Sequence, residues 1–150
     1  MPPSLRDSHK KTTKGIITMT ITRTLIKEDQ RLGTLPHYFG KGCFKFEMTV
    51  YSLCDHYLDK YHGGYWDFCR LSNNGFYMTL RSDKIFTFNN PDNYCCEQID
   101  ADTMSIIINL YALSHLSISN HDAPYTEFYF KLRDYAGEHK NASLIFKAID

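Results

Sequence analysis

The fold of this chain is organised around residues 61–78, which read YHGGYWDFCRLSNNGFYM. They contain the single tryptophan of the protein, Trp66, together with several tyrosine and phenylalanine side chains. Glycine reaches backbone angles that are closed to other residues, so the pair Gly63-Gly64 ends whatever element precedes it. The aromatic residues that follow are typical of a β-strand. We therefore predict that a strand begins directly after the glycine pair.

The second half of this stretch predicts a chain reversal. Asn74-Gly75 lies between two strand-like segments, 65–71 and 76–80. Both residues tolerate positive φ, so this dipeptide is a strong signal for a type I′ hairpin turn. The stretch is thus expected to form an antiparallel hairpin with a large aromatic surface.

Helical patterns precede the hairpin. We expect short helical pieces within residues 24–39, with Thr24 as a cap, and a long helix over residues 43–61. Gly33 and Pro36 are expected to break the first region. The side chains expected to face the core recur at spacings of three and four: Leu32, Leu35, Tyr38 and Phe39, then Phe44, Met48, Tyr51, Leu58 and Tyr61.

Two more strands and three helices are predicted after the hairpin. The strands cover residues 84–88 and 94–99, and Asp100 is expected to cap an apolar helix over residues 102–118 that lies centrally. A further helix capped by Asp122 should bury Tyr125, Phe128, Leu132 and Tyr135 and end at Gly137. The last helix should start at Asn141 and bury Leu144, Ile145, Ala148 and Ile149.

This order predicts an α+β fold, with a three- or four-stranded antiparallel meander packed against about four to five helices. We expect a single domain over residues 21–150. Residues 1–20 are polar, basic and without periodicity, and are expected to be a disordered extension or an artefact of an upstream start, with Met19 as the alternative first residue.

The charge distribution excludes one class of mechanism. The 150 residues have a formal net charge of zero. Residues 1–18 hold four basic side chains against one acidic side chain, a net charge of +3, which leaves −3 on the rest. Such a body cannot imitate duplex DNA, which carries about one negative charge per ~1.7 Å of its axis. Its overall field is also too weak to attract nucleic acid strongly.

The five cysteines predict free thiols in a reducing cytoplasm, because their number is odd and no secretory signal precedes them. No apolar run is long enough to cross a bilayer. The spacing of the cysteines and histidines predicts neither a metal site nor a cofactor site, and no catalytic residue is assigned. Two alternatives stay open at this point: a hydrolase that uses Cys54 and His62, and a weak DNA-binding module in which Trp66 stacks on bases.

One resemblance spans the chain from about residue 31 to residue 150. Its longest motif is residues 61–66 with residues 71–78, and shorter matches are Arg31-Leu32, Leu35-Pro36, Phe39-Gly40 and residues 148–150. These motifs resemble the ArdB/KlcA antirestriction family. The resemblance implies a small cytoplasmic protein of plasmids and other mobile elements, which protects incoming DNA from host type I restriction enzymes without catalysis or a cofactor.

The resemblance and the aromatic hairpin together predict a protein-contact surface. Tyrosine, tryptophan and arginine are enriched at interface hot spots. The expected partner is a type I restriction-modification enzyme or an associated host protein. The residues expected to make the contact are Arg31, Tyr61, His62, Tyr65, Trp66, Asn74 and Tyr77, with Gly63, Gly64 and Gly75 as structural turn residues.

Overall fold

The computed structural model describes residues 11–13, 16–18, 20–121 and 124–150. Five α-helices lie in these residues: α1 (Thr34–Phe39), α2 (Cys43–Tyr57), α3 (Ala101–Ser119), α4 (Tyr125–Ala136) and α5 (Ala142–Ile149). Two short 3-10 helices, Glu28–Gln30 and Gly40–Gly42, flank α1. Helices and antiparallel strands occupy separate parts of the chain, so the predicted α+β class is confirmed, although strands β3 (Arg23–Leu25) and β4 (Leu58–Asp59) were not predicted.

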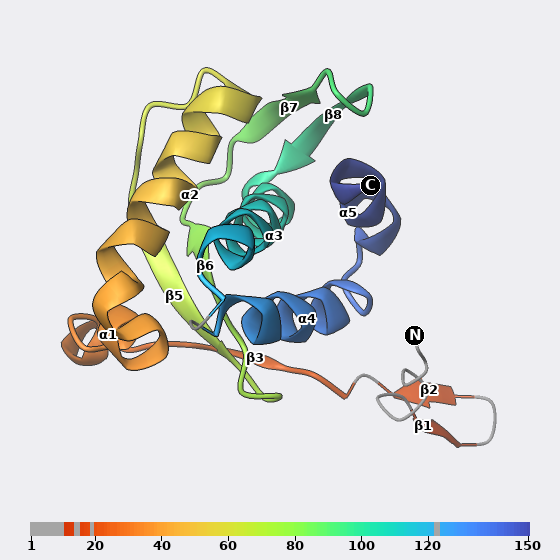
Figure 1. The fold of residues 1–150 in the computed structure, drawn as a ribbon. Helices are drawn as coiled ribbons and strands as arrows, with labels where there is room; N and C mark the ends of the chain where they lie inside the picture. Colours follow the sequence, from red (N-terminus) through yellow and green to blue (C-terminus); the bar gives the residue numbers. More distant parts are fainter. Residues whose placement is uncertain (1–10, 14–15, 19, 122–123) are drawn as a thin grey trace.

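Helix α3 lies at the centre of the molecule, as predicted (Figure 1). It packs against α2, α4, α5 and strand β6 (Phe76–Leu80). The side chain of Asp100 caps it by accepting a hydrogen bond of 2.8 Å from the Thr103 N–H. Residues 106–108 are all isoleucine and all fully buried. A helix that is apolar on several sides must be enclosed by the rest of the fold, and this one is.

The strands form two three-stranded sheets rather than one continuous meander. One sheet has the order β3-β5-β6 and the other β4-β7-β8. Their remaining members are β3 (Arg23–Leu25), β5 (Trp66–Leu71), β4 (Leu58–Asp59), β7 (Ile85–Asn90) and β8 (Cys95–Asp100). All four strands predicted from residue 65 onward are therefore present, paired as two antiparallel hairpins.

The division between the sheets has a local cause at the edge of β6. Asn109 of α3 accepts a hydrogen bond from the Met78 N–H at 3.0 Å and donates one to the Met78 carbonyl at 2.8 Å. Ser105 of the same helix accepts a bond of 2.9 Å from the Leu80 N–H. A helix thus satisfies the backbone groups that a neighbouring strand would otherwise use. Strand β7 pairs instead with β4 and β8.

The turn of the first hairpin differs from the predicted type I′ turn. Asn74 has φ +68°, but Gly75 does not have positive φ. The Asn74 N–H donates to the Leu71 carbonyl, and the Leu71 N–H donates to the Gly75 carbonyl, both at 3.0 Å. The loop is therefore longer by one residue, with Asn74 alone in the left-handed region. Glycine also avoids crowding at position 75, because a Cβ there would lie 2.9 Å from Oδ1 of Asn73 and 3.0 Å from Cβ of Lys131.

The segment before the hairpin contains the main errors of the sequence interpretation. Thr24 lies in strand β3 and does not cap a helix, because β3 pairs with β5. Leu32 is 96% exposed instead of buried. Pro36 does not break the region but lies inside α1, near its start, where the missing N–H costs little.

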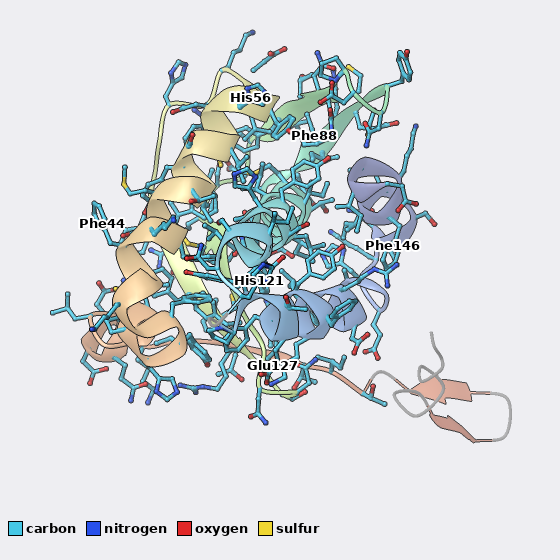
Figure 2. The ribbon with its side chains drawn as sticks, viewed as in Figure 1. Phe44, His56, Phe88, His121, Glu127 and Phe146 are labelled. Atoms are coloured by element: carbon cyan, nitrogen blue, oxygen red, sulfur yellow. The ribbon has the colours of Figure 1, made fainter. Side chains whose placement is uncertain are left out.

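Helix α2 is shorter than predicted and rotated about its axis. It ends at Tyr57, and Leu58 then enters a strand. Its buried side chains are Phe46, Val50 and Cys54, at spacings of four. Phe44, which was expected to face the core, is 69% exposed and points away from the body in Figure 2. Met48 on the same predicted stripe is also exposed.

The C-terminal helices agree with the sequence. All four residues predicted for the stripe of α4 are buried, and Gly137 follows the helix as its C-cap. Helix α5 follows Asn141 and buries Ile145 and Ala148, while Leu144 and Ile149 pack against the core. The predicted cap Asp122 lies outside the described residues.

Strands β1 (Lys11–Thr13) and β2 (Ile16–Thr18) pair with each other within the predicted extension. Residue 20 is tied to the body of the fold, since the Thr20 hydroxyl donates to the Glu138 carboxylate at 2.8 Å. None of the helices in the described ranges combines the length and apolar character that a bilayer crossing requires.

Candidate functional site

The aromatic surface predicted from the sequence is centred on Tyr65, just before β5. Tyr65 is 39% exposed. The guanidinium carbon of Arg31 lies 4.5 Å from the centre of its ring, and that of Arg81 lies at the same distance. The Tyr65 hydroxyl donates to the Glu28 carboxylate at 2.7 Å, and this hydrogen bond raises the pKa of Tyr65. The structure therefore brings Arg31 and Tyr65, two of the residues proposed for the contact, into direct contact.

Arg31 is held between two aromatic rings. Its guanidinium carbon also lies 4.3 Å from the ring centre of Phe68, so the cation is stacked on both sides. Planar guanidinium groups stack on aromatic faces more favourably than ammonium groups do. Its atom Nη1 is buried without a hydrogen-bond partner among the described residues, and its nearest carboxylate, Glu28, is 3.9 Å from Nε. Arg31 thus retains unused hydrogen-bonding capacity beside the exposed Tyr65.

Trp66 and Tyr77 do not belong to this surface, which corrects the sequence interpretation. Trp66 is 3% exposed, and its indole N–H donates to the Tyr61 hydroxyl at 3.2 Å. Tyr77 is fully buried. The alternation of β5 turns Trp66 inward and leaves Tyr65, one residue earlier, on the outside. Both buried side chains stabilise the hairpin and are unavailable to a partner.

The other predicted residues lie at two ends of the hairpin. His62, Gly63 and Gly64 are exposed in the connection between β4 and β5, and both glycines have positive φ. Tyr61, in the same connection, is half-buried. Asn74 is exposed at the opposite end, in the turn between β5 and β6. The predicted set therefore divides between the two ends of the hairpin.

A polar network under the hairpin was not recognised in the sequence. Its centre is the carboxylate of Asp102, in the first turn of α3. Oδ1 accepts hydrogen bonds of 2.8 Å from Arg23, Tyr77 and Thr79, and Oδ2 lies 3.0 Å from Nε2 of His139. The sequence assigned Asp102 only a favourable place in the first helical turn. The five residues are separated by up to 116 positions, so no local pattern marks them as a group.

The network shifts the pKa values of its members. Burial alone would favour the neutral acid of Asp102, but the hydrogen bonds from His139 and Tyr77 and the charge of Arg23 hold its pKa well below the usual range. Burial and the adjacent Asp102 charge raise the pKa of Tyr77. Asp102 is therefore an anion at neutral pH and accepts hydrogen bonds from four donors. Such an arrangement fixes the position of α3 against the first sheet.

This network is poorly suited to acid–base catalysis. The Asn141 N–H donates to Nδ1 of His139 at 3.0 Å, so Nε2 carries the proton and donates to Asp102. Both ring nitrogens of His139 are occupied, and its side chain is only 8% exposed. A general base needs a free nitrogen within reach of a substrate proton. The network is better explained as a structural element.

The cysteine proposed as the nucleophile of a hydrolase is unsuited to that role. Cys54 is fully buried in α2, and burial raises its pKa to about 12. A nucleophilic cysteine must ionise near neutral pH and be accessible to its substrate. His62, the proposed partner, is exposed in a loop. Within the described ranges, no group of three or more potential metal ligands comes together.

Salt bridges neutralise part of the acidic surface. Among the described residues, six carboxylates have an arginine or lysine partner within 4.0 Å: Arg23–Asp102, Arg31–Glu28, Arg81–Asp67, Lys131–Glu127, Lys140–Asp100 and Lys147–Glu97. A protein that imitates a duplex presents dense negative charge. The formal net charge of zero and these pairs are contrary to that requirement.

Comparison with known proteins places the chain among antirestriction proteins. Residues 59–150 match the family described as Antirestriction protein. Antirestriction protein KlcA of Escherichia coli is 33% identical over 138 residues, which cover 87% of this chain and 94% of KlcA. The uncharacterized protein YafX of Escherichia coli strain K12 is 31% identical over 134 residues, covering 87% of this chain and 88% of YafX.

A solved structure agrees in fold. It comes from work on the KlcA and ArdB proteins, which are described as showing a novel fold and antirestriction activity against type I DNA restriction systems in vivo but not in vitro. It superposes with a TM-score of 0.81 at 30% identity and covers 93% of this chain and 98% of its own. This protein belongs to the ArdB/KlcA antirestriction family.

Proposed function

We propose that this protein protects incoming DNA from type I restriction by contacting a protein of the restriction pathway, and not by imitating DNA. The observation that carries the proposal is the formal net charge of zero, together with the pairing of six carboxylates with cations among the described residues. A decoy for a DNA-binding groove needs a strong field of negative charge. A protein of this charge does not produce such a field, so a protein contact is the better explanation.

The relatives support the same mechanism. The KlcA and ArdB proteins act against type I systems in vivo but not in vitro. A decoy that competes with DNA would act on the purified enzyme as well, because competition needs only the enzyme and its substrate. Activity confined to cells is expected when the target is a further protein, or a state of the enzyme, that the purified reaction lacks.

The exposed part of the predicted aromatic surface is the proposed contact. Tyr65 and His62 present accessible side chains at one end of the hairpin, and Arg31 packs against the ring of Tyr65. Tyrosine contributes a large contact area with few rotatable bonds, and arginine is enriched at interface hot spots. Asn74 marks the second end of the contact, at the turn.

The test compares cells with purified components. Unmodified phage is plated on cells that carry a type I system, with and without this protein, and the same system is purified and assayed for cleavage of unmodified DNA. We expect protection in cells and unchanged cleavage in the purified reaction. Competition between this protein and DNA for the purified enzyme would contradict the proposed mechanism, and absence of protection in cells would contradict the proposed activity.

Surface variants locate the contact. Tyr65→Ala removes an exposed ring and should lower protection in cells, whereas Tyr94→Ala, which removes a 92% exposed ring from the distant β7–β8 turn, should not. Both variants should keep the far-ultraviolet circular dichroism of the native protein. Equal protection by the two variants would show that Tyr65 lies outside the contact.

A further inference from the structure

Two adjoining hollows form a groove between α1, α4 and the turn of the first hairpin. Their volumes are about 380 Å³ and 360 Å³, and both are lined by His37, Tyr38 and Arg70. Asn74 and Lys131 line the second hollow only. The groove thus begins beside α1 and reaches the exposed end of the hairpin turn.

Arg70 is the cation at the centre of this groove. It lies on β5 as an exposed residue and has no carboxylate within 4.0 Å among the described residues. None of the described residues that line the two hollows is an aspartate or a glutamate. Arg81, the other arginine of the hairpin region, donates hydrogen bonds of 2.6 Å and 3.0 Å to the carboxylate of Asp67. Arg70 therefore keeps its whole guanidinium fork available to an external anion.

The walls of the groove favour a peptide over a nucleic acid. The ring of Tyr38 stacks on Phe76 with centres 4.7 Å apart and meets Phe128 edge-on at 5.5 Å. Lys131, the second cation, is already paired with Glu127 at 2.6 Å. One free arginine beside the rings of Tyr38 and Phe128 fits a carboxylate that is flanked by apolar side chains better than a row of phosphates.

We propose that this groove binds an acidic segment of the partner protein, in which a glutamate or aspartate pairs with Arg70 and neighbouring apolar side chains cover Tyr38. The proposal rests on the proposed function, because it names the chemistry of the same partner. It adds Arg70 and His37 to the contact and connects them to Asn74, which the sequence had already indicated.

A charge-reversal pair tests the groove in cells. Arg70→Glu places a negative charge against the incoming carboxylate, and Lys140→Glu makes the same change at an exposed lysine between α4 and α5. Loss of one charge-assisted hydrogen bond and its replacement by repulsion should lower protection about tenfold or more in Arg70→Glu. Lys140→Glu should protect like the native protein. Matching circular dichroism spectra and melting temperatures show that both variants are folded.

A binding experiment tests the ligand chemistry directly. The isotope-labelled native protein is titrated with a short capped peptide of alternating glutamate and leucine, and with the same peptide in which glutamine replaces glutamate. We expect the first peptide alone to shift the amide resonances of His37, Arg70 and Asn74, and Arg70→Glu to abolish the shifts. Identical effects of both peptides, no shift at these positions, or shifts caused only by a single-stranded oligonucleotide would overturn the proposal.

Failure of the proposed function and failure of the groove proposal give different results in cells. If the native protein does not protect cells, the proposed function fails. If the native protein and Arg70→Glu protect equally, the function stands and the groove is not the contact.

Discussion

The phenol of Tyr77 donates a hydrogen bond of 2.8 Å to the carboxylate of Asp102, and this bond joins the centre of the hairpin to the first turn of α3. The two residues are 25 positions apart in the chain. The same carboxylate oxygen also accepts from Arg23 on β3, at the other edge of the same sheet. One anion therefore holds three separate elements in place, and its removal should affect the whole fold.

Asp102→Asn should lower the free energy of unfolding by about 2–3 kcal/mol. The substitution removes the charge that Arg23 faces, and the amide nitrogen of asparagine would point at one of the four donors. Urea denaturation monitored by circular dichroism measures the change. Asp83→Asn is the control, since Asp83 is exposed and has no ion-pair partner among the described residues. Equal stability of the two variants would contradict the structural role of Asp102.

The stability contributed by Asp102 should depend on pH in one direction. Its pKa is lower in the folded state than the value of about 3.9 expected in the unfolded chain. The contribution is therefore fully present above about pH 4 and is lost as the pH falls from there toward the folded pKa, because the unfolded chain binds the proton first.

This pH dependence can be measured by comparing the native protein with Asp102→Asn. The difference in unfolding free energy between the native protein and Asp102→Asn should be constant from neutral pH down to about pH 5 and should shrink below about pH 4. A difference that grows as the pH falls would mean that Asp102 is protonated more easily in the folded state.

Trp66→Ala should destabilise the protein by about 3–5 kcal/mol, because a 3% exposed indole leaves a large cavity when it is truncated. Trp66→Phe should cost less, since most of the volume is kept. Thermal unfolding measures both changes. A loss of protection in Trp66→Ala would thus report on stability and not on a contact. Native-like stability of Trp66→Ala would show that the indole is not part of the core.

The stack of Arg31 on Tyr65 should be measurable as a coupling energy. A double-mutant cycle with Arg31→Met and Tyr65→Leu should give about 0.5–1 kcal/mol, the range for a partly exposed cation–π pair. Methionine keeps much of the apolar length of arginine and removes the charge. A coupling energy of zero would show that the guanidinium and the ring do not interact in solution, although their separation is 4.5 Å.

Asn74→Val should cost about 1–2 kcal/mol, because a β-branched residue is strained at the φ of +68° that Asn74 adopts. Asn74→Gly should leave stability nearly unchanged, since glycine accepts this conformation without strain. The free energies come from urea denaturation of both variants. If valine is tolerated as well as glycine, the turn does not hold Asn74 in the left-handed region.

Local patterns were sufficient for several parts of this fold. The aromatic run that begins after Gly63-Gly64 and reverses near Asn74 predicted the first hairpin. The isoleucines after Asp100 predicted a capped and enclosed helix. The stripe from Tyr125 to Tyr135 predicted the buried face of α4. In each case the residues that decide the structure lie within one or two turns of one another, so their spacing carries the information.

The sequence predicted only part of the proposed aromatic contact surface. Aromatic composition indicated a recognition surface, but composition does not say which ring faces outward. Tyr65 and Trp66 are neighbours in the chain, and the strand places one outside and the other inside. Helix α2 is likewise rotated from the predicted orientation, so that Phe44 is exposed and Phe46 is buried. The aromatic composition of this helix does not say which of its rings faces the core.

The sequence by itself determined the class of the fold, the central hairpin and helix, the family resemblance and the lack of charge for imitating DNA. Only the tertiary structure decided that Asn109 of α3 satisfies the edge of β6, that Asp102 gathers Arg23, Tyr77 and His139, and that Arg70 lies unpaired in a groove. These features join residues that are far apart in the chain. Their hydrogen bonds and charges exist only after packing has brought the elements together, so no periodicity along the sequence records them.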